Sequence, residues 1–228
     1  MDAVIQYLPI ATTLFAAFFF TQIYAHYRRR RTAYLLWWSL GVLTFGLGTL
    51  TESIHALFGW HALNLRCWYI VGAFLGAFPL AQGSVYLLMR KRFADVMAIL
   101  FTALIIVAAF CVFMTPIELS PGFDGRLTGT VFAWRWVRFF SPFVNTYAFI
   151  FLVGGAVYSA LRYYRQGDRR ASFKGNIVIA VGGLLPGIGG TATRLGHVEW
   201  LFVTELIGLI LIYAGYRIVR GDKRRAVA

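Results

Sequence analysis

The chain has 228 residues, of which 59% are hydrophobic and only 14% are charged, and its mean hydropathy is +0.68. A chain of this composition has too little polar surface to cover a water-soluble globule of its size. The net charge of +13 does not indicate nucleic-acid binding, because the basic residues lie in short clusters between apolar segments of membrane-spanning length. We therefore expect a polytopic membrane protein.

Seven apolar segments are long enough to cross a bilayer as helices, which takes about 20 residues each. In chain order they are residues 3–26, 33–59, 65–89, 93–115, 141–163, 174–194 and 198–218. The first follows Asp2 without a basic stretch or a small-residue cleavage pattern, so we expect a retained helix rather than a signal peptide. The sequence thus predicts an all-α membrane protein, a seven-transmembrane helix bundle that forms a single domain over residues 1–228.

The distribution of Lys and Arg predicts how this bundle is oriented. Seventeen of the 22 basic residues lie in the connections after the first, third and fifth spans and in the C-terminal tail. The other five are Arg66, Arg126, Arg135, Arg138 and Arg194. Because cytoplasmic loops carry the excess of basic residues, the N-terminus is expected outside and the C-terminus in the cytoplasm.

The chain also contains two similar stretches. The segment from Tyr24 and the segment from Ala160 each have an aromatic and basic turn, then a helix that ends in a Gly-rich run before Thr. They run in the same direction, which predicts a 3+1+3 internal repeat of helices. Parallel repeats occur in transporters and in receptor-like bundles, so the repeat does not choose between them. Basic turns and Gly-rich helices also look alike without any repeat, and both interpretations stay open.

Glycine spacing predicts which helices pack closely. The segments GAFLG at 72–76 and GLLPG at 183–187 have the GxxxG spacing, and Gly41 and Gly48 lie on one face of the second span. Small residues at this spacing let helix backbones approach one another in lipid. We expect the second, third and sixth helices to be close neighbours.

Other residues inside the spans predict bends and polar contacts. Pro79 and Pro186 each lack the N–H that a preceding carbonyl would accept, so each favours a kink. The amides of Gln82, Asn145 and Asn176 are most simply explained as interhelical hydrogen-bonding groups.

The stretch TLTESIHALFGWH, at 49–61, places ionisable groups inside the second span. An ionised carboxylate in hydrocarbon costs about 3 kcal/mol without a partner. At 1.5 Å per residue Glu52 lies about 12 Å below the outer interface, and Glu205, in the span that runs inward, lies at nearly the same depth. His55 shares a face with Glu52, and Arg194 and His197 lie near the outer end of the last two spans. These five residues predict a ligand-binding pocket that opens to the outer side.

A structural role for these groups also stays open. Either glutamate could be neutral, or paired with Arg194, and only fix the order of the helices. His61, Glu199 and His197 are also explained as hydrated loop residues. If both glutamates are charged and close together, Arg194 or a bound cation has to compensate them.

The sequence excludes one further chemistry and gives two others little support. A retinal Schiff base is excluded, because the lysines lie at the cytoplasmic ends of their helices: Lys91, Lys174 and Lys223. A metal-dependent membrane enzyme needs three ligands and an open position, but no HxxxH or HExxH motif occurs. A haem held by His55 and His197 has no further support. No cofactor follows from the sequence.

The connection before the fifth span, PIELSPGFDGRLTGTVFAWRWVRFF, covers residues 116–140. Its Pro and Gly content predicts turns, with FDGR closing a short hairpin, and FAWRWVRFF predicts an interfacial helix. We expect an ordered cap on the outer mouth of the bundle. Cys67 and Cys111 lie toward the same side and are either a disulfide or free thiols.

The segments TLTES and LRCWYIVGAFLGAFPLAQGSVYLLMRKR, within 49–92, resemble the seven-helix N-terminal sensor region of bacterial histidine kinases. The matching positions are Glu52, Tyr69, Gly72, Pro79 and Tyr86. The resemblance implies a ligand-sensing bundle in the plasma (inner) membrane of a bacterium. Because the 228 residues contain no kinase or other output domain, it also implies that the bundle signals through a separate protein.

Three functions therefore remain as hypotheses. The first is a ligand-binding or sensor-type bundle with a polar pocket in its outer half. The second is a small transporter of the 3+1+3 plan, which requires access to the site from both sides of the membrane. The third is a metal-dependent membrane enzyme. The sequence does not identify the ligand.

Overall fold

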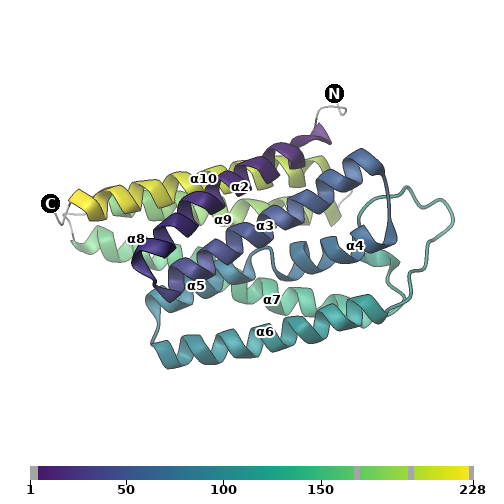
Figure 1. Cartoon of the computed structure of the whole chain (residues 1–228), viewed down its shortest axis with the longest axis horizontal. Helices are drawn as coiled ribbons and strands as arrows, with labels where there is room; N and C mark the ends of the chain where they lie inside the picture. Colours follow the sequence, from purple (N-terminus) through teal and green to yellow (C-terminus); the bar gives the residue numbers. More distant parts are fainter. Residues whose placement is uncertain (1–4, 167–169, 195–197, 226–228) are drawn as a thin grey trace.

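The computed structural model describes residues 5–166, 170–194 and 198–225. Among these residues, seven helical segments are long and apolar enough to cross a membrane. They lie side by side along one direction, and α2 begins at one end of the bundle while α10 ends at the other (Figure 1). The protein is an integral membrane protein, as its composition predicts, because helices of this kind satisfy their backbone hydrogen bonds without water.

Each predicted apolar segment overlaps one of these spans. Single helices form five of them: α2 (Leu8–Arg30), α3 (Ala33–Phe58), α6 (Lys91–Met114), α9 (Arg170–Arg194) and α10 (Val198–Arg225). The third span consists of α4 (Ala62–Trp68), the π-helical turn η1 (Tyr69–Phe74) and α5 (Phe78–Leu88). The fifth consists of the 3₁₀ turn η3 (Arg135–Phe139), α7 (Phe140–Ala148), the π-helical turn η4 (Phe149–Gly154) and α8 (Gly155–Gln166). A second 3₁₀ turn, η2 (Gly129–Val131), lies in the connection before it.

Six of the spans form a ring. Helix α3 packs between α2 and α5, the third span packs against the fifth, α8 packs against α9, and α10 packs against both α9 and α2. Helix α6 stands outside this ring and contacts the third and fifth spans (Figure 1). The first three and the last three spans therefore meet along two seams, with α6 as the link between them.

The composition of α6 explains its outside position. Its span has a mean hydropathy of 2.9, the highest of the seven. The buried side chains on its inner face are mostly small: Ala94, Ala98, Ile105, Ala108 and Val112. Large apolar side chains on its other faces are exposed in the protein, among them Ile99, Ile106 and Phe110. Such a helix packs through one narrow stripe and leaves the rest of its surface to lipid.

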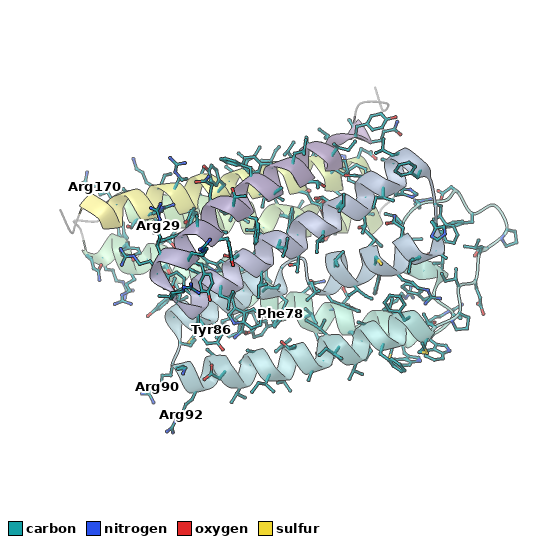
Figure 2. The ribbon with its side chains drawn as sticks, viewed as in Figure 1. Arg29, Phe78, Tyr86, Arg90, Arg92 and Arg170 are labelled. Atoms are coloured by element: carbon teal, nitrogen blue, oxygen red, sulfur yellow. The ribbon has the colours of Figure 1, made fainter. Side chains whose placement is uncertain are left out.

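The basic residues gather at one end of the bundle, where Arg29, Arg90, Arg92 and Arg170 lie (Figure 2). We call this the basic end, and we call the opposite end, which carries the connection 115–134, the loop end. The excess of basic residues predicts that the basic end faces the cytoplasm. On that prediction the loop end is the outer end.

Glycines every seven residues hold α9 and α10 together. A Cβ atom added at Gly182 would lie 2.7 Å from the carbonyl oxygen of Gly208, and one added at Gly215 would lie 2.5 Å from that of Gly175. Gly189 lies in the same way against α10, near Leu201. Side chains larger than hydrogen at these positions would push the two helices apart. Among the described helices, this pair has the most extensive contact.

The glycine prediction is therefore right for one pair of helices and wrong for another. A Cβ at Gly48 would lie 3.5 Å from the Cα of Gly72, so the second and third spans are close neighbours. In the GLLPG segment, however, Gly183 faces Leu152 of the fifth span, and no described atom lies within 4 Å of a Cβ at Gly187. The sixth helix, α9, packs closely on α10 instead, through Gly175, Gly182 and Gly189.

Pro79 interrupts the third span in the way its chemistry requires. A proline has no N–H, so the carbonyl of Leu75, four residues before, loses its helical partner. The hydroxyl of Thr44 on α3 donates a 2.8 Å hydrogen bond to this carbonyl. The span breaks between η1 and α5 at this point. Helix α9, in contrast, runs continuously past Pro186.

Only one of the three predicted interhelical amides has that role. Gln82 is fully buried and donates to the carbonyl of Ala94 on α6 (2.8 Å), while Tyr147 on α7 donates to its side-chain oxygen (2.5 Å). Asn145 and Asn176 instead donate to groups four residues earlier in their own helices. Their shorter side chains reach back along the helix, so the prediction for these two is wrong.

Candidate functional site

Glu52 lies on α3, two turns before the helix ends, and its side chain is only 4% exposed. The indole N–H of Trp68 on α4 donates a 3.0 Å hydrogen bond to its Oε1 atom. The second oxygen, Oε2, is buried and has no hydrogen-bond partner among the described residues. Trp68 thus fixes only one of the two oxygens of this carboxyl group.

Glu205 on α10 lies beside Glu52. The two carboxyl groups lie close enough to interact electrostatically, and the Oε2 atom of Glu205 is also buried without a partner in the part of the chain that is described. The depths derived from the helical rise had placed both groups at one level. Helix α2 packs between α3 and α10, so the two side chains meet inside the bundle rather than at a contact between neighbouring helices. Two carboxylates this close repel each other unless a proton or a cation lies between them.

Glu52 also lines a pocket of about 620 Å³ at the loop end. Helices α3, α4 and α10 and the connection supply its walls: Glu52, His55, Trp60, Trp68, Glu199, Phe202 and residues 124–127. Glu205 lies behind Glu52 rather than on the wall. The volume falls in the range of about 300 to 1,000 Å³ that is typical of small-molecule sites.

The connection 115–134 closes over this pocket. An antiparallel bridge between Ile117 and Phe132 joins its two ends, with a 2.8 Å hydrogen bond from the Glu118 N–H to the Val131 carbonyl. Phe123 packs edge-on against Trp60, which lies on the pocket wall. The connection is therefore an ordered cap, as expected. The hairpin differs from the prediction, because its paired residues lie at the base of the connection rather than beside FDGR.

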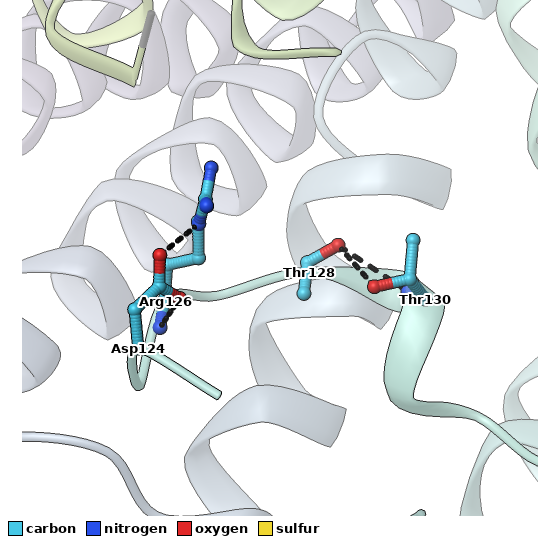
Figure 3. A network of polar contacts seen from close by, with 4 residues as sticks. All are labelled: Asp124, Arg126, Thr128 and Thr130. Carbon is cyan, nitrogen blue, oxygen red and sulfur yellow. Dashed lines mark hydrogen bonds and ion pairs between the residues drawn. The ribbon is translucent and has the colours of Figure 1, made fainter. Parts of the chain in front are cut away.

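Short-range hydrogen bonds hold the tip of the cap (Figure 3). The guanidinium of Arg126 donates to Asp124 at 2.6 Å, and the Thr128 and Thr130 hydroxyls lie 3.1 Å apart. Slight desolvation opposes the shift, but hydrogen bonds from the backbone and side chain of Arg126 lower the pKa of the Asp124 carboxyl. Both side chains of the pair are half exposed. The pair therefore orders the loop locally and contributes little to global stability.

The other predicted site residues have different outcomes. His55 is half-buried on the pocket wall, and its Nδ1 atom has no partner among the described residues. His61 is exposed and accepts a hydrogen bond from the Leu63 N–H at the start of α4, which fits the interpretation as a loop residue. The side chain of Arg194 and the whole of His197 lie outside the described residues.

Trp68 is a site residue that the sequence did not predict. An indole N–H that is removed from water needs an acceptor. The preceding helix offers the carboxylate of Glu52 as such an acceptor, and this was the signal available in the sequence. Cys67, its neighbour, and Cys111 are both free thiols in the structure.

A second, smaller cavity lies in the half of the bundle toward the basic end. Its volume is about 50 Å³, and its walls are mainly apolar and come from α2, α3, α5, α8, α9 and α10. Trp38 lines it, and the indole nitrogen of Trp38 is buried without a partner among the residues described. This cavity is too small for the ligands that the first pocket would hold.

No protein-family model, curated protein or solved structure matches the chain.

Proposed function

We propose that the protein is a sensor-type ligand-binding protein whose pocket opens on the outer side of the membrane. One observation carries the proposal. The Glu52 carboxyl group is almost fully buried on the wall of a 620 Å³ pocket, and its Oε2 atom lacks a partner among the described residues. Burial of a polar atom without a partner is unfavourable, so a ligand that bonds to this oxygen would offset the cost.

Helix α10 is the element that would carry a signal across the membrane. It holds Glu205 near the pocket, and at the basic end its Tyr216 hydroxyl lies 2.8 Å from Nδ1 of His26 on α2. Farther along, Asp222 accepts a hydrogen bond from the Ser172 N–H at the start of α9 (3.1 Å). A ligand that separates Glu205 from Glu52 would shift α10 and change these contacts. A separate protein bound at the basic end would detect that change.

The location that fits this proposal is the plasma (inner) membrane of a bacterium, with the loop end outside. The asymmetric distribution of basic residues supports the orientation. The resemblance of residues 49–92 to bacterial sensor regions supports the choice of membrane.

The test is to replace Glu52 by Gln and to measure thermal stability and bound ligand in the same purified protein. We expect the fold to persist, because glutamine keeps a hydrogen-bonding group and removes a buried charge, while ligand copurified with the wild type is lost. Glu118→Gln is the matched control, since Glu118 is exposed and lies outside the pocket.

A purely structural Glu52 would give the opposite result. The loss of one partner of a buried pair costs about 3 to 5 kcal/mol, so stability would fall while ligand binding stayed unchanged. That outcome would overturn the proposal.

A small transporter is the second candidate, and the cavity near Trp38 is the observation that favours it. The outer pocket and this cavity lie in opposite halves of the same ring, so a helix movement that joined them would open a path. Flux of the ligand into proteoliposomes would establish transport, whereas binding without flux would support the sensor. No observation favours a metal-dependent enzyme, since among the described residues no three His, Cys, Asp or Glu side chains lie together in a metal-binding group.

A further inference from the structure

We infer that the pocket at the loop end binds a protonated amine, that is, an organic ammonium ion with an apolar body. This inference rests on the proposed ligand-binding function and adds the chemical class of the ligand. It draws on the charge at the base of the pocket, the aromatic side chains around it and its size.

The side chains at the base of the pocket are acidic, although the net charge of the whole protein is +13. Glu52 and, behind it, Glu205 each have one buried oxygen without a hydrogen-bond partner in the described residues. Arg126 is a cation on the described wall, and its guanidinium already binds Asp124. An anionic ligand would therefore face the Glu52 carboxyl group, whereas an ammonium group would donate a hydrogen bond to Glu52, with the Glu205 carboxyl group behind it.

Trp68 prepares Glu52 for such a ligand. Its indole N–H occupies Oε1 and fixes the plane of the carboxyl group, so that Oε2 remains for a donor from the pocket. Three aromatic side chains line the same pocket: Trp60, Trp68 and Phe202. Ring faces attract cations, and they do so more strongly when water is excluded.

The size and the ligand set separate an organic cation from a metal ion. A pocket of about 620 Å³ is far larger than an ion requires and suits a small organic molecule. The described residues contain no group of three metal-binding side chains, and the two glutamates alone do not complete a metal coordination shell. An ammonium group needs fewer ligands, because it has at most three hydrogens to donate.

Three probes of equal size and different charge test the inference: phenethylamine, 2-phenylethanol and phenylacetate. Each is titrated at neutral pH into the wild-type protein in an uncharged detergent, and binding is measured by calorimetry and by the shift in melting temperature. We expect the ammonium probe to bind at least tenfold more tightly than the alcohol, and phenylacetate not to bind. A wild-type preference for the ammonium probe does not depend on whether any variant folds.

Two variants assign the preference to the pocket. Glu52→Gln should reduce the affinity for phenethylamine at least tenfold but have little effect on the affinity for 2-phenylethanol. Glu118→Gln should leave both affinities unchanged. Phe202→Leu keeps both carboxyl groups and should weaken the binding of phenethylamine severalfold. This variant replaces Glu52→Gln as the test if Glu52→Gln does not fold.

Equal binding of the three probes, a preference for phenylacetate, or no binding of phenethylamine at millimolar concentration would each overturn the inference. None of these results would remove the proposed function, which is judged separately by the ligand that copurifies with the wild type and is lost in Glu52→Gln. If no such ligand exists but phenethylamine binds through Glu52, the ligand class stands and the sensor role requires its own support.

Discussion

The hydrogen bond from Thr44 to the Leu75 carbonyl makes a quantitative prediction about the break in the third span. Thr44→Val keeps the shape of the side chain and removes the donor, so the carbonyl that Pro79 leaves free loses its 2.8 Å partner. Interhelical hydrogen bonds in membrane proteins contribute about 0.6 to 1.7 kcal/mol each. We expect Thr44→Val to lower the free energy of unfolding by about 1 kcal/mol.

A double-mutant cycle isolates this contribution. In Pro79→Ala the residue at position 79 regains an N–H, which can bond to the Leu75 carbonyl within its own helix. Thr44→Val should then cost less than half as much as it does in the wild type. The assay is unfolding by SDS titration in mixed micelles, with helix content and tryptophan fluorescence as readouts. An equal cost of Thr44→Val in both backgrounds would refute the reasoning that the hydroxyl substitutes for the missing proline N–H.

Three further predictions concern other parts of the protein. Gly182→Leu should separate α9 from α10 and lower the melting temperature by several degrees, whereas Gly187→Leu, whose site is open to a larger side chain, should be tolerated. Asp124→Asn should speed proteolysis of the cap between residues 122 and 129 at neutral pH. Arg126 lowers the pKa of the Asp124 carboxyl, so the ion pair orders the cap at a pH above the usual Asp pKa of about 4. The ion pair is lost as the pH falls through the lowered pKa. In strong acid the variant and the wild type should therefore be cleaved at the same rate. A cysteine at position 124 should react with an impermeant reagent outside intact cells and one at Arg92 should not; the reverse pattern would invert the orientation.

Hydropathy and helical rise account for what the sequence could predict. The spans follow from apolar length, and the proximity of Glu52 to Glu205 follows from counting residues from the ends of two antiparallel spans. Apolar length and helical rise give the position of a residue along a helix, but not the direction in which its side chain points around the helix axis.

The failed predictions within the helices concern direction around the axis. The GxxxG spacing of 183–187 marks small residues but not the face that a neighbour covers, and α9 packs on α10 through the seven-residue spacing that includes Gly182 instead. Asn176 and Gln82 carry the same amide, yet only the longer side chain reaches another helix. The π-helical turns change the direction of every residue that follows them, and their positions depend on packing between helices.

The position of α6 outside the ring makes it the natural place for a reporter group. Ile106 is 64% exposed on the face away from the third and fifth spans, and the pocket lies on the other side of the ring wall. A fluorophore attached there would replace lipid contacts only and leave the carboxyl pair and the cap untouched. Paired with a second dye at the basic end of α10, it would turn any ligand-driven movement of that helix into a change of energy-transfer efficiency in single molecules.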